Sequence, residues 1–291
     1  MHDTYFFTDI HGQLHLYNYI INYCKAQDEG CTIVYGGDAC DRGPDGFKIM
    51  NDLLQDPQII YLKGNHEDLF VKAARSIYQF IQSENVSLND FISKSFAEDI
   101  ILSTYTQSVL LYLRNGGMPT LQDWIINSKC DMHFVNQIDN LPYTYRYNNY
   151  DICHSGSTPE DFAAVEKYEY KNARKRIPSY LKEAILWDRD HLADEWSENR
   201  TAIFGHTPTI LLNKNFPKQT EATITPSKWN LYKTHNGNKL DMDTGATWTG
   251  RAFVANLTTG NIIGIQDYDI NTKETNHRIQ FISDFSMNIN E

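Results

Sequence analysis

The chain reads TYFFTDIHG at residues 4–12, TIVYGGDACDRG at residues 32–43 and IIYLKGNHE at residues 59–67. Each segment opens with a short apolar run, rich in β-branched and aromatic residues, which is typical of a buried strand. Between these runs, apolar residues such as Tyr17 and Ile20 recur at helical spacing. Each strand–helix unit takes about thirty residues, the size of a right-handed crossover to a parallel strand. The start of the chain therefore predicts a β-α-β-α-β run and an α/β fold.

The rest of the chain is predicted to add a helical insertion, further strands and a polar tail. Residues from about 68 to 140 contain helical stretches and lack strong strand runs, so we expect a cap-like helical insertion there. Strand signals return at Tyr150–Cys153, Thr201–Phe204, Trp229–Lys233 and Arg251–Leu257. We expect one catalytic domain over residues 1–266, followed by a loosely held polar C-terminal tail at 267–291.

Five of the predicted strands end in a loop that carries Asp, His or Asn beside glycine. The loops are Asp9-Ile10-His11-Gly12, Gly37-Asp38-Ala39-Cys40-Asp41-Arg42-Gly43, Gly64-Asn65-His66-Glu67, His154-Ser155-Gly156 and Gly205-His206-Thr207-Pro208. Because sites in open α/β sheets lie beyond the carboxyl ends of the strands, these loops can converge in one crevice. Carboxylate, imidazole and amide oxygen together suit manganese, iron or zinc, whereas calcium would take oxygen ligands only. We expect two divalent metal ions bridged by Asp38, with manganese first and iron or zinc as alternatives.

The five motifs, in this order, resemble the phosphoprotein phosphatase branch of the calcineurin-like metallophosphoesterases, in its bacterial and phage subgroup. The similarity runs from residue 9 to about residue 257. It includes three secondary segments: Arg114-Asn115-Gly116-Gly117, Leu186-Trp187-Asp188-Arg189 and Asp243-Thr244-Gly245-Ala246. The resemblance implies a four-layer α-β-β-α fold, a β-sandwich flanked by helices. It also implies a metal-dependent phosphatase that hydrolyses phosphomonoesters by direct attack of a metal-bound hydroxide.

The resemblance assigns six residues to the two metal ions. The first ion would be held by Asp9, His11 and Asp38. The second ion would be held by Asp38, Asn65, His154 and His206. None of these ligands is missing from the chain.

Four further residues receive catalytic roles from the same resemblance. His66 would be the general acid that protonates the leaving oxygen, and Asp41 would orient it. Arg42 and Arg189 would clamp the phosphate oxygens, a role that suits the planar guanidinium group. Lys63 departs from the family pattern, because it stands where an arginine is usual, so that one phosphate contact becomes a point charge or is lost.

Three functions remain open from the sequence. The first is a serine/threonine, or also tyrosine, protein phosphatase. The second is a hydrolase of dinucleoside polyphosphates such as diadenosine tetraphosphate, in which Asp commonly replaces Glu67; that one residue favours the first function. The third is a non-catalytic metal-binding module, which would have no need of Asp41, Arg42 and His66.

The composition describes an acidic chain with the apolar content of a globular protein. The 291 residues carry a net charge of −11 and are 41% hydrophobic. This charge argues against a surface that coats nucleic acid, although a metal cluster could still attract a phosphorylated protein or a small phosphoester. The five cysteines form no CxxC pair, which favours reduced thiols. We find no signal peptide and no run of about 20 apolar residues, and we expect a cytoplasmic protein without membrane contact.

Overall fold

The computed structural model describes residues 2–84, 106–194, 196–197, 199–215, 231–233, 238–269 and 274–284. Its strands are β1 (Thr4–Phe7), β2 (Thr32–Tyr35), β3 (Ile59–Tyr61), β4 (Thr144–Tyr147), β5 (Tyr150–Cys153), β6 (Thr201–Phe204), β7 (Tyr232–Lys233), β8 (Lys239–Asp241), β9 (Arg251–Asn256), β10 (Asn261–Asp269) and β11 (Glu274–Asp284). Residues 229–230 of one predicted strand, part of the predicted insertion at 85–105, and residues 285–291 lie outside the described residues.

Helices connect many of the strands along the chain. They are α1 (Leu14–Gln27), α2 (Gly46–Gln55), α3 (Asn65–Ser83), α6 (Gln107–Arg114), α7 (Met118–Ile126), α8 (Met132–Asp139), α9 (Pro159–Tyr170), α10 (Ser179–Trp187), α11 (Thr209–Asn215) and α12 (Ala246–Thr249). Two short 3-10 turns, η1 (Arg174–Arg176) and η2 (Asp190–Ala193), flank α10. None of the helices in the described ranges is long and apolar enough to cross a membrane.

Two mixed sheets form the centre of the described chain. The first has the strand order β11-β10-β9-β1-β2-β3, and the second has the order β4-β5-β6-β8-β7. In the first sheet β1 pairs with β2, and β2 with β3, in parallel. The predicted β-α-β-α-β run is therefore confirmed. In the second sheet β5, β6 and β8 are also parallel, so several strands deliver their carboxyl ends to one region.

Alternating side chains of the strands hold the layers together. Phe6 of β1 and Val34 of β2 point into a buried cluster that also contains Ile152 and Ile203 of the second sheet, so the two sheets pack face to face. Phe7, the neighbour of Phe6, points the other way, because successive strand side chains alternate between faces.

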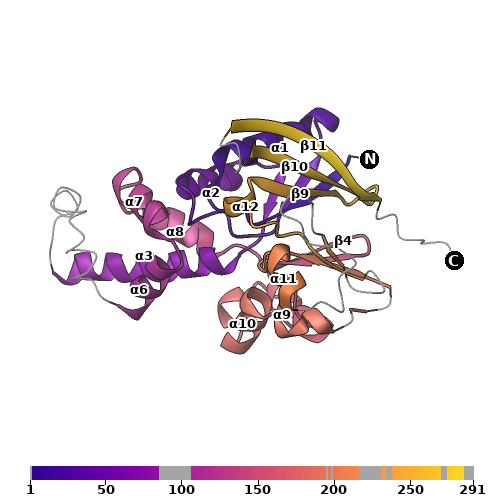
Figure 1. Cartoon of the computed structure of the whole chain (residues 1–291). Helices are drawn as coiled ribbons and strands as arrows, with labels where there is room; N and C mark the ends of the chain where they lie inside the picture. Colours follow the sequence, from indigo (N-terminus) through magenta and orange to yellow (C-terminus); the bar gives the residue numbers. More distant parts are fainter. Residues whose placement is uncertain are drawn as a thin grey trace.

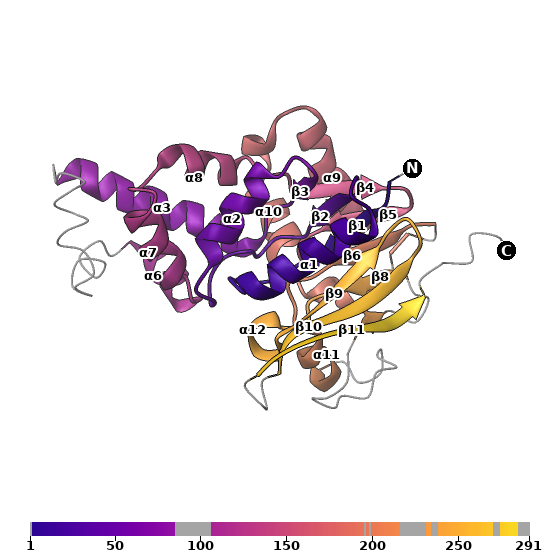
Figure 2. The same ribbon diagram turned by 90° about the horizontal axis from the view of Figure 1, so that it is seen from above.

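Helices cover the outer faces of both sheets. The cluster around Phe7 includes Ile20 of α1 and Met50 of α2. A third cluster packs α9 and α10 against the outer face of the second sheet. The result is the four-layer α-β-β-α arrangement (Figures 1 and 2), which confirms the predicted fold class.

Helices α3, α6, α7 and α8 lie together beside the sandwich, at the left of Figure 1. Helix α3 packs against α6 and α8, and the Phe70 ring contacts the rings of Tyr112, Trp124 and Phe134. Helix α3 begins at Asn65, inside the third polar loop. The helical layer is therefore attached directly to that loop.

The C-terminal end of the chain contains strands where a loosely held polar tail was expected. Strand β10 continues to Asp269, and β11 pairs with it antiparallel over Glu274–Asp284. The polar composition concealed this strand, because a ladder of backbone hydrogen bonds does not require apolar side chains.

Candidate metal centre

The polar loops have an unusual backbone at the residues that the sequence singled out. Six of these residues adopt positive φ angles between 47° and 72°: Asp9, His11, Asp38, Asp41, Arg42 and His206. Such angles are uncommon for residues with a side chain, and they cluster at functional sites. At Gly37 (φ 100°) an added Cβ would lie 2.6 Å from the Gly64 backbone nitrogen, so glycine permits the second and third loops to cross closely.

The Glu67 carboxylate holds the crossing loops together. It accepts hydrogen bonds from the backbone N–H groups of Gly64 (2.7 Å), Asp38 (2.9 Å) and Ala39 (2.8 Å), and from the hydroxyl of Tyr61 (2.8 Å). Glu67 is completely buried. The Glu67 carboxylate therefore faces the protein backbone, and it positions the loop that carries Asp38.

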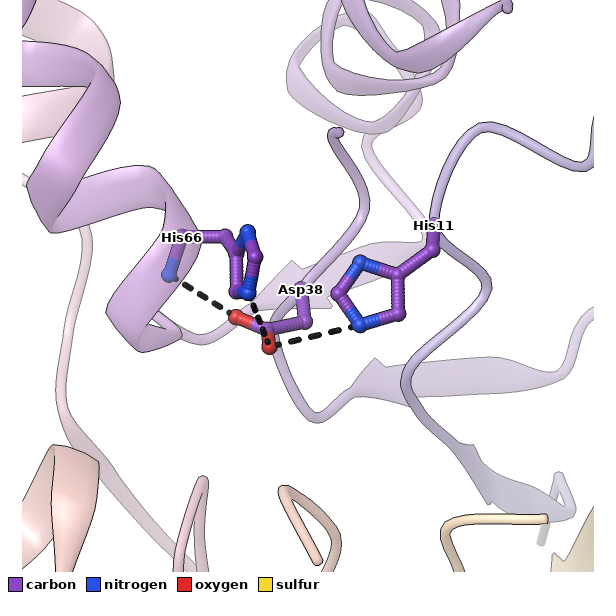
Figure 3. Close-up of side chains that lie close together, drawn as sticks. All are labelled: His11, Asp38 and His66. Carbon is purple, nitrogen blue, oxygen red and sulfur yellow. Dashed lines mark hydrogen bonds and ion pairs between the residues drawn. The ribbon is translucent and has the colours of Figure 1, made fainter. Parts of the chain in front are cut away.

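The Asp38 carboxylate lies at the centre of three imidazoles. Its Oδ2 is 3.6 Å from His11 Nε2 and 3.8 Å from His66 Nε2, and its Oδ1 is 3.3 Å from His154 Nε2. Figure 3 shows His11 and His66 directed toward this carboxylate from opposite sides. All four side chains are buried.

The hydrogen bonds of the histidines fix which ring nitrogen faces the centre. His11 Nδ1 lies 2.8 Å from the Cys40 carbonyl oxygen, and His154 Nδ1 lies 2.9 Å from that of Gly36. Because a carbonyl can only accept, each Nδ1 carries a proton, and each Nε2 is the ring nitrogen turned toward Asp38. Metal-binding histidines in proteins are commonly held by such a bond from the other nitrogen.

A second group of donor atoms surrounds Asn65. Its Oδ1 is 2.8 Å from His154 Nε2 and 2.9 Å from His206 Nδ1, and the other His206 nitrogen donates to the Trp187 carbonyl. The potential ligand atoms form two buried groups that share Asp38, one with His11 and His66 and one with His154 and His206. These groups bring imidazole nitrogens and a shared carboxylate together, a combination of ligand atoms that fits a dinuclear metal site.

Asp9 is buried next to these groups but is oriented differently. Its carboxylate accepts the backbone N–H of His206 (3.1 and 3.2 Å) and the hydroxyl of Thr8 (2.6 Å). Burial and the nearby carboxylate of Asp243 raise the pKa of Asp9 well above its usual range. The structure thus places Asp9 beside His206, outside the two groups, and its role as a ligand stays a prediction.

His66 is held on one side by Asp41, which helix α6 supports. His66 Nδ1 donates to Asp41 Oδ2 over 2.7 Å, and the Tyr112 hydroxyl donates to Asp41 Oδ1. Thr120 accepts the backbone N–H of Asp41. Burial lowers the pKa of His66, but the neighbouring Asp38 and Asp41 carboxylates outweigh it, and the pKa is raised. The other ring nitrogen, Nε2, faces the centre, 3.8 Å from Asp38 Oδ2.

Two exposed guanidinium groups lie on opposite sides of the centre. The Arg42 guanidinium nitrogens lie 2.8 Å from His11 Nε2 and 3.1 Å from His66 Nε2. Arg189 donates weakly to the Trp187 carbonyl (3.4 Å), the same oxygen that His206 contacts. Both arginines therefore lie within reach of an anion at the metal centre.

Comparison with known families gives one match. The sequence profile of the calcineurin-like phosphoesterases matches residues 3–210, well over half of the chain. The chain belongs to this family. Together with the two buried His/Asp groups, this makes the protein a metal-dependent phosphoesterase. No curated protein sequence matches the phosphoesterase significantly.

Solved structures share the fold of the phosphoesterase at low sequence identity. A variant of a cold-active protein tyrosine phosphatase has a TM-score of 0.50 and 12% identity, over 96% of this chain and 80% of that chain. A proposed diadenosine tetraphosphatase has a TM-score of 0.47 and 14% identity, over 97% and 95%. A serine/threonine phosphatase from Saccharomyces cerevisiae has a TM-score of 0.43 and 14% identity, over 97% and 80%. At these identities the similarity concerns the fold alone.

Sequence reasoning missed several residues of this centre. Asp243 is buried close to Arg42 and Asp38, and burial raises its pKa to about 6. The resemblance of the segment at residues 243–246 to the family assigns no role to Asp243. The supporting contacts of Tyr112 and Thr120 depend on tertiary packing, and no local signal reveals them. Lys63 points away from the centre, as its bonds to helix α8 show.

Proposed function

We propose that this phosphoesterase is a protein phosphatase that removes phosphate from serine and threonine side chains, with tyrosine as a further substrate. The observation that carries the proposal is the His66–Asp41 pair. The Nε2 atom of His66 faces the metal centre between Asp38 and Arg42, while its Nδ1 is bound by Asp41. That position suits the donation of a proton to a leaving oxygen.

We assign the metal ions to the residues that the resemblance indicated: Asp9, His11, Asp38, Asn65, His154 and His206. Manganese is our first candidate because the donor set mixes nitrogen with carboxylate and amide oxygen. When bound, two such ions supply a water molecule of lowered pKa and neutralise charge on the phosphate. Arg42 and Arg189 hold the phosphate oxygens, and His66 gives its proton to the departing oxygen.

The leaving group distinguishes the candidate substrates. A serine alkoxide is a very poor leaving group and needs a proton, whereas the nucleotide phosphate released from a dinucleoside polyphosphate leaves more readily. A His66 held by Asp41, itself held by Tyr112, is therefore of most use with a phosphomonoester of an alcohol. The preferred partner is a phosphorylated protein, and hydrolysis of dinucleoside polyphosphates is the alternative.

Substitution of His66 tests the proposal. His66→Asn should lower the rate on a phosphoserine peptide on the order of 10²–10⁴-fold, the usual contribution of a positioned general acid. The same variant should lose much less on nitrophenyl phosphate, because nitrophenolate leaves without a proton. Steady-state rates on both substrates and on diadenosine tetraphosphate give the comparison, with the metal content of each variant measured by elemental analysis.

His206→Asn is the matched control. It removes an imidazole from the second group and should lower the rates on both substrates alike. Equal losses on both substrates for His66→Asn, or a loss of metal that accounts for its defect, would assign His66 to metal binding. A wild-type enzyme that prefers diadenosine tetraphosphate to every phosphopeptide would refute the protein phosphatase.

A further inference from the structure

A basic pocket opens on the surface away from the metal centre. It has a volume of 260 Å³ and is lined by Arg75, Asp139, Tyr143, Arg174, Lys175 and Lys182. These residues come from α3, α8, η1 and α10 and from the segment before β4. Elements far apart in the sequence thus build one cationic concavity.

The acidic groups of the basic pocket are already engaged. Asp139 accepts from buried Lys63 (3.4 Å) and from Arg75 (2.8 Å), and Glu169 beside the pocket pairs with Arg174 (3.0 Å). Lys175 and Lys182 form no ion pair with any residue that the structure describes.

The pocket therefore has an excess of positive charge. Five cationic side chains, including Lys63, stand against two carboxylates in a chain whose net charge is −11. An anionic group that enters would meet two cations without a competing carboxylate partner.

A groove lies beside the basic pocket and extends to Trp187, a neighbour of the metal centre. This lateral groove has a volume of 560 Å³, and Lys182 lines both the groove and the basic pocket. Its apolar lining includes Leu69 of α3, Leu111 of α6 and Leu186 of α10. Its lining also includes Trp187, whose carbonyl accepts a hydrogen bond from His206 and whose ring is 5.9 Å from the His206 ring.

We propose that the lateral groove and the basic pocket bind the substrate polypeptide beside its phosphorylated residue, and that the basic pocket receives an acidic side chain of that polypeptide. The inference rests on the proposed protein phosphatase function and specifies its substrate. A mixed apolar and charged groove suits an extended peptide, in which apolar and polar side chains alternate. The acidic group is a carboxylate or a second phosphate.

The helix between the two sites sets the spacing. Lys182 and Trp187 are five residues apart on α10, which corresponds to about 7–8 Å along the helix axis. An extended chain covers this length in about two to three residues. Since the phosphate lies beyond Trp187 and the pocket extends past Lys182, we expect the acidic residue roughly three to five positions from the phosphoserine.

A peptide scan with a paired substitution tests the proposal. A phosphoserine peptide in an alanine background carries one glutamate, or one second phosphoserine, at each of the six positions on either side. For the wild-type enzyme, kcat/KM should rise on the order of tenfold when the acidic residue stands three to five positions away on one side only, the effect expected of charge-assisted contacts. The Lys175→Glu/Lys182→Glu enzyme should lose this preference and keep its rate on nitrophenyl phosphate.

The matched control is Lys48→Glu/Lys167→Glu. It makes the same charge change at exposed lysines of α2 and α9, outside the lateral groove and the basic pocket. It should keep the preference, which separates a local contact from the change in net charge. If the wild-type enzyme hydrolyses phosphopeptides equally well at every position of the acid, the basic pocket is not a substrate site, and the protein phosphatase function stands. If the wild-type enzyme hydrolyses nitrophenyl phosphate but no phosphopeptide, the proposed function fails, and this inference fails with it.

Discussion

Lys63 illustrates how the surroundings of a single residue decide its role. Its side chain is completely buried, and Nζ donates to the Asp139 carbonyl (2.7 Å) and lies 5.1 Å from the centre of the Tyr143 ring. Burial lowers the pKa of this ammonium, and Asp139 opposes the shift. Lys63 thus joins the start of the third loop to the end of α8. It does not point toward a phosphate at the metal centre.

The substitution Lys63→Met should therefore affect stability and not phosphate binding. We expect the free energy of unfolding to fall by about 1–3 kcal/mol, the cost of leaving buried acceptors without a donor. The KM for nitrophenyl phosphate should remain unchanged. Arg42→Ala is the contrast, because it removes a guanidinium beside His11 and His66 and should lower kcat as well as kcat/KM. Denaturant unfolding and steady-state kinetics of both variants decide, and a larger kinetic defect at Lys63 would reverse these roles.

At the residue scale, the sequence reveals side chains that follow strand ends and conceals those that support them. His11 and Asp38 could be predicted to meet because the parallel strands β1 and β2 end at the same edge of the first sheet. His154 follows β5 of the second sheet, and it reaches the centre because the two sheets pack face to face. The direction of Glu67 and Lys63 could not, because it depends on which backbone groups the crossing loops leave without a partner. The Asp9 carboxylate also turns toward His206 N–H, a contact between residues almost two hundred positions apart.

At the scale of elements, the helical layer does more than cover the sheet. Helix α6 delivers Tyr112 to Asp41, and the turn between α6 and α7 accepts the backbone N–H of Arg42 at Gly116 (2.9 Å). Helix α7 contributes Thr120 to the same loop. The segment that the sequence describes only as an insertion therefore holds the residues that position Asp41 and, through it, His66.

Removal of the Tyr112 hydroxyl tests this support. In Tyr112→Phe, Asp41 keeps His66 but loses its second donor, so the imidazole is held less firmly. We expect a loss of roughly 10-fold on phosphoserine peptide, a fraction of the general-acid contribution, and a smaller loss on nitrophenyl phosphate. Steady-state rates on the two substrates give the measurement, with Tyr180→Phe on the exposed side of α10 as the control. Unchanged selectivity between the substrates would mean that the hydroxyl serves packing alone.

Elements with a strong periodic pattern were the predictable ones. The three parallel strands and their helices follow from apolar runs and helical spacing, and the structure places them where expected. Strand β11 could not be predicted from its side chains, because backbone hydrogen bonds to its partner β10 hold it in the sheet. The basic pocket was equally hidden, since its cationic lining residues lie on three separate elements, α3, η1 and α10.

At the scale of the whole molecule, several carboxyl groups are buried together in the core of this phosphoesterase. Asp9, Asp38, Asp241 and Asp243 are all buried around the metal centre. Burial and Asp243 raise the pKa of Asp241 well above its usual range, and its Oδ2 has no hydrogen-bond partner among the described residues. Buried carboxylates that face one another are costly to ionise. Bound cations would offset that cost, so metal binding and folding stability should be linked.

This linkage predicts that metal removal destabilises the fold. A ligand at 100 times its Kd that binds only the folded state adds about 2.7 kcal/mol, which for a chain of this size corresponds to about 4 °C in Tm. Manganese should therefore raise the Tm of the chelator-treated enzyme by that amount, in a concentration-dependent manner. Asp38→Asn should abolish the shift, because Asp38 is the carboxylate that both ligand groups share. Asp52→Asn on the surface of α2 should preserve it. Thermal unfolding monitored by circular dichroism, with elemental analysis of each protein, gives the measurement. A wild-type Tm that does not respond to manganese, iron or zinc would contradict the linkage, and an Asp38→Asn protein that still binds two ions would show that this carboxylate does not bridge them.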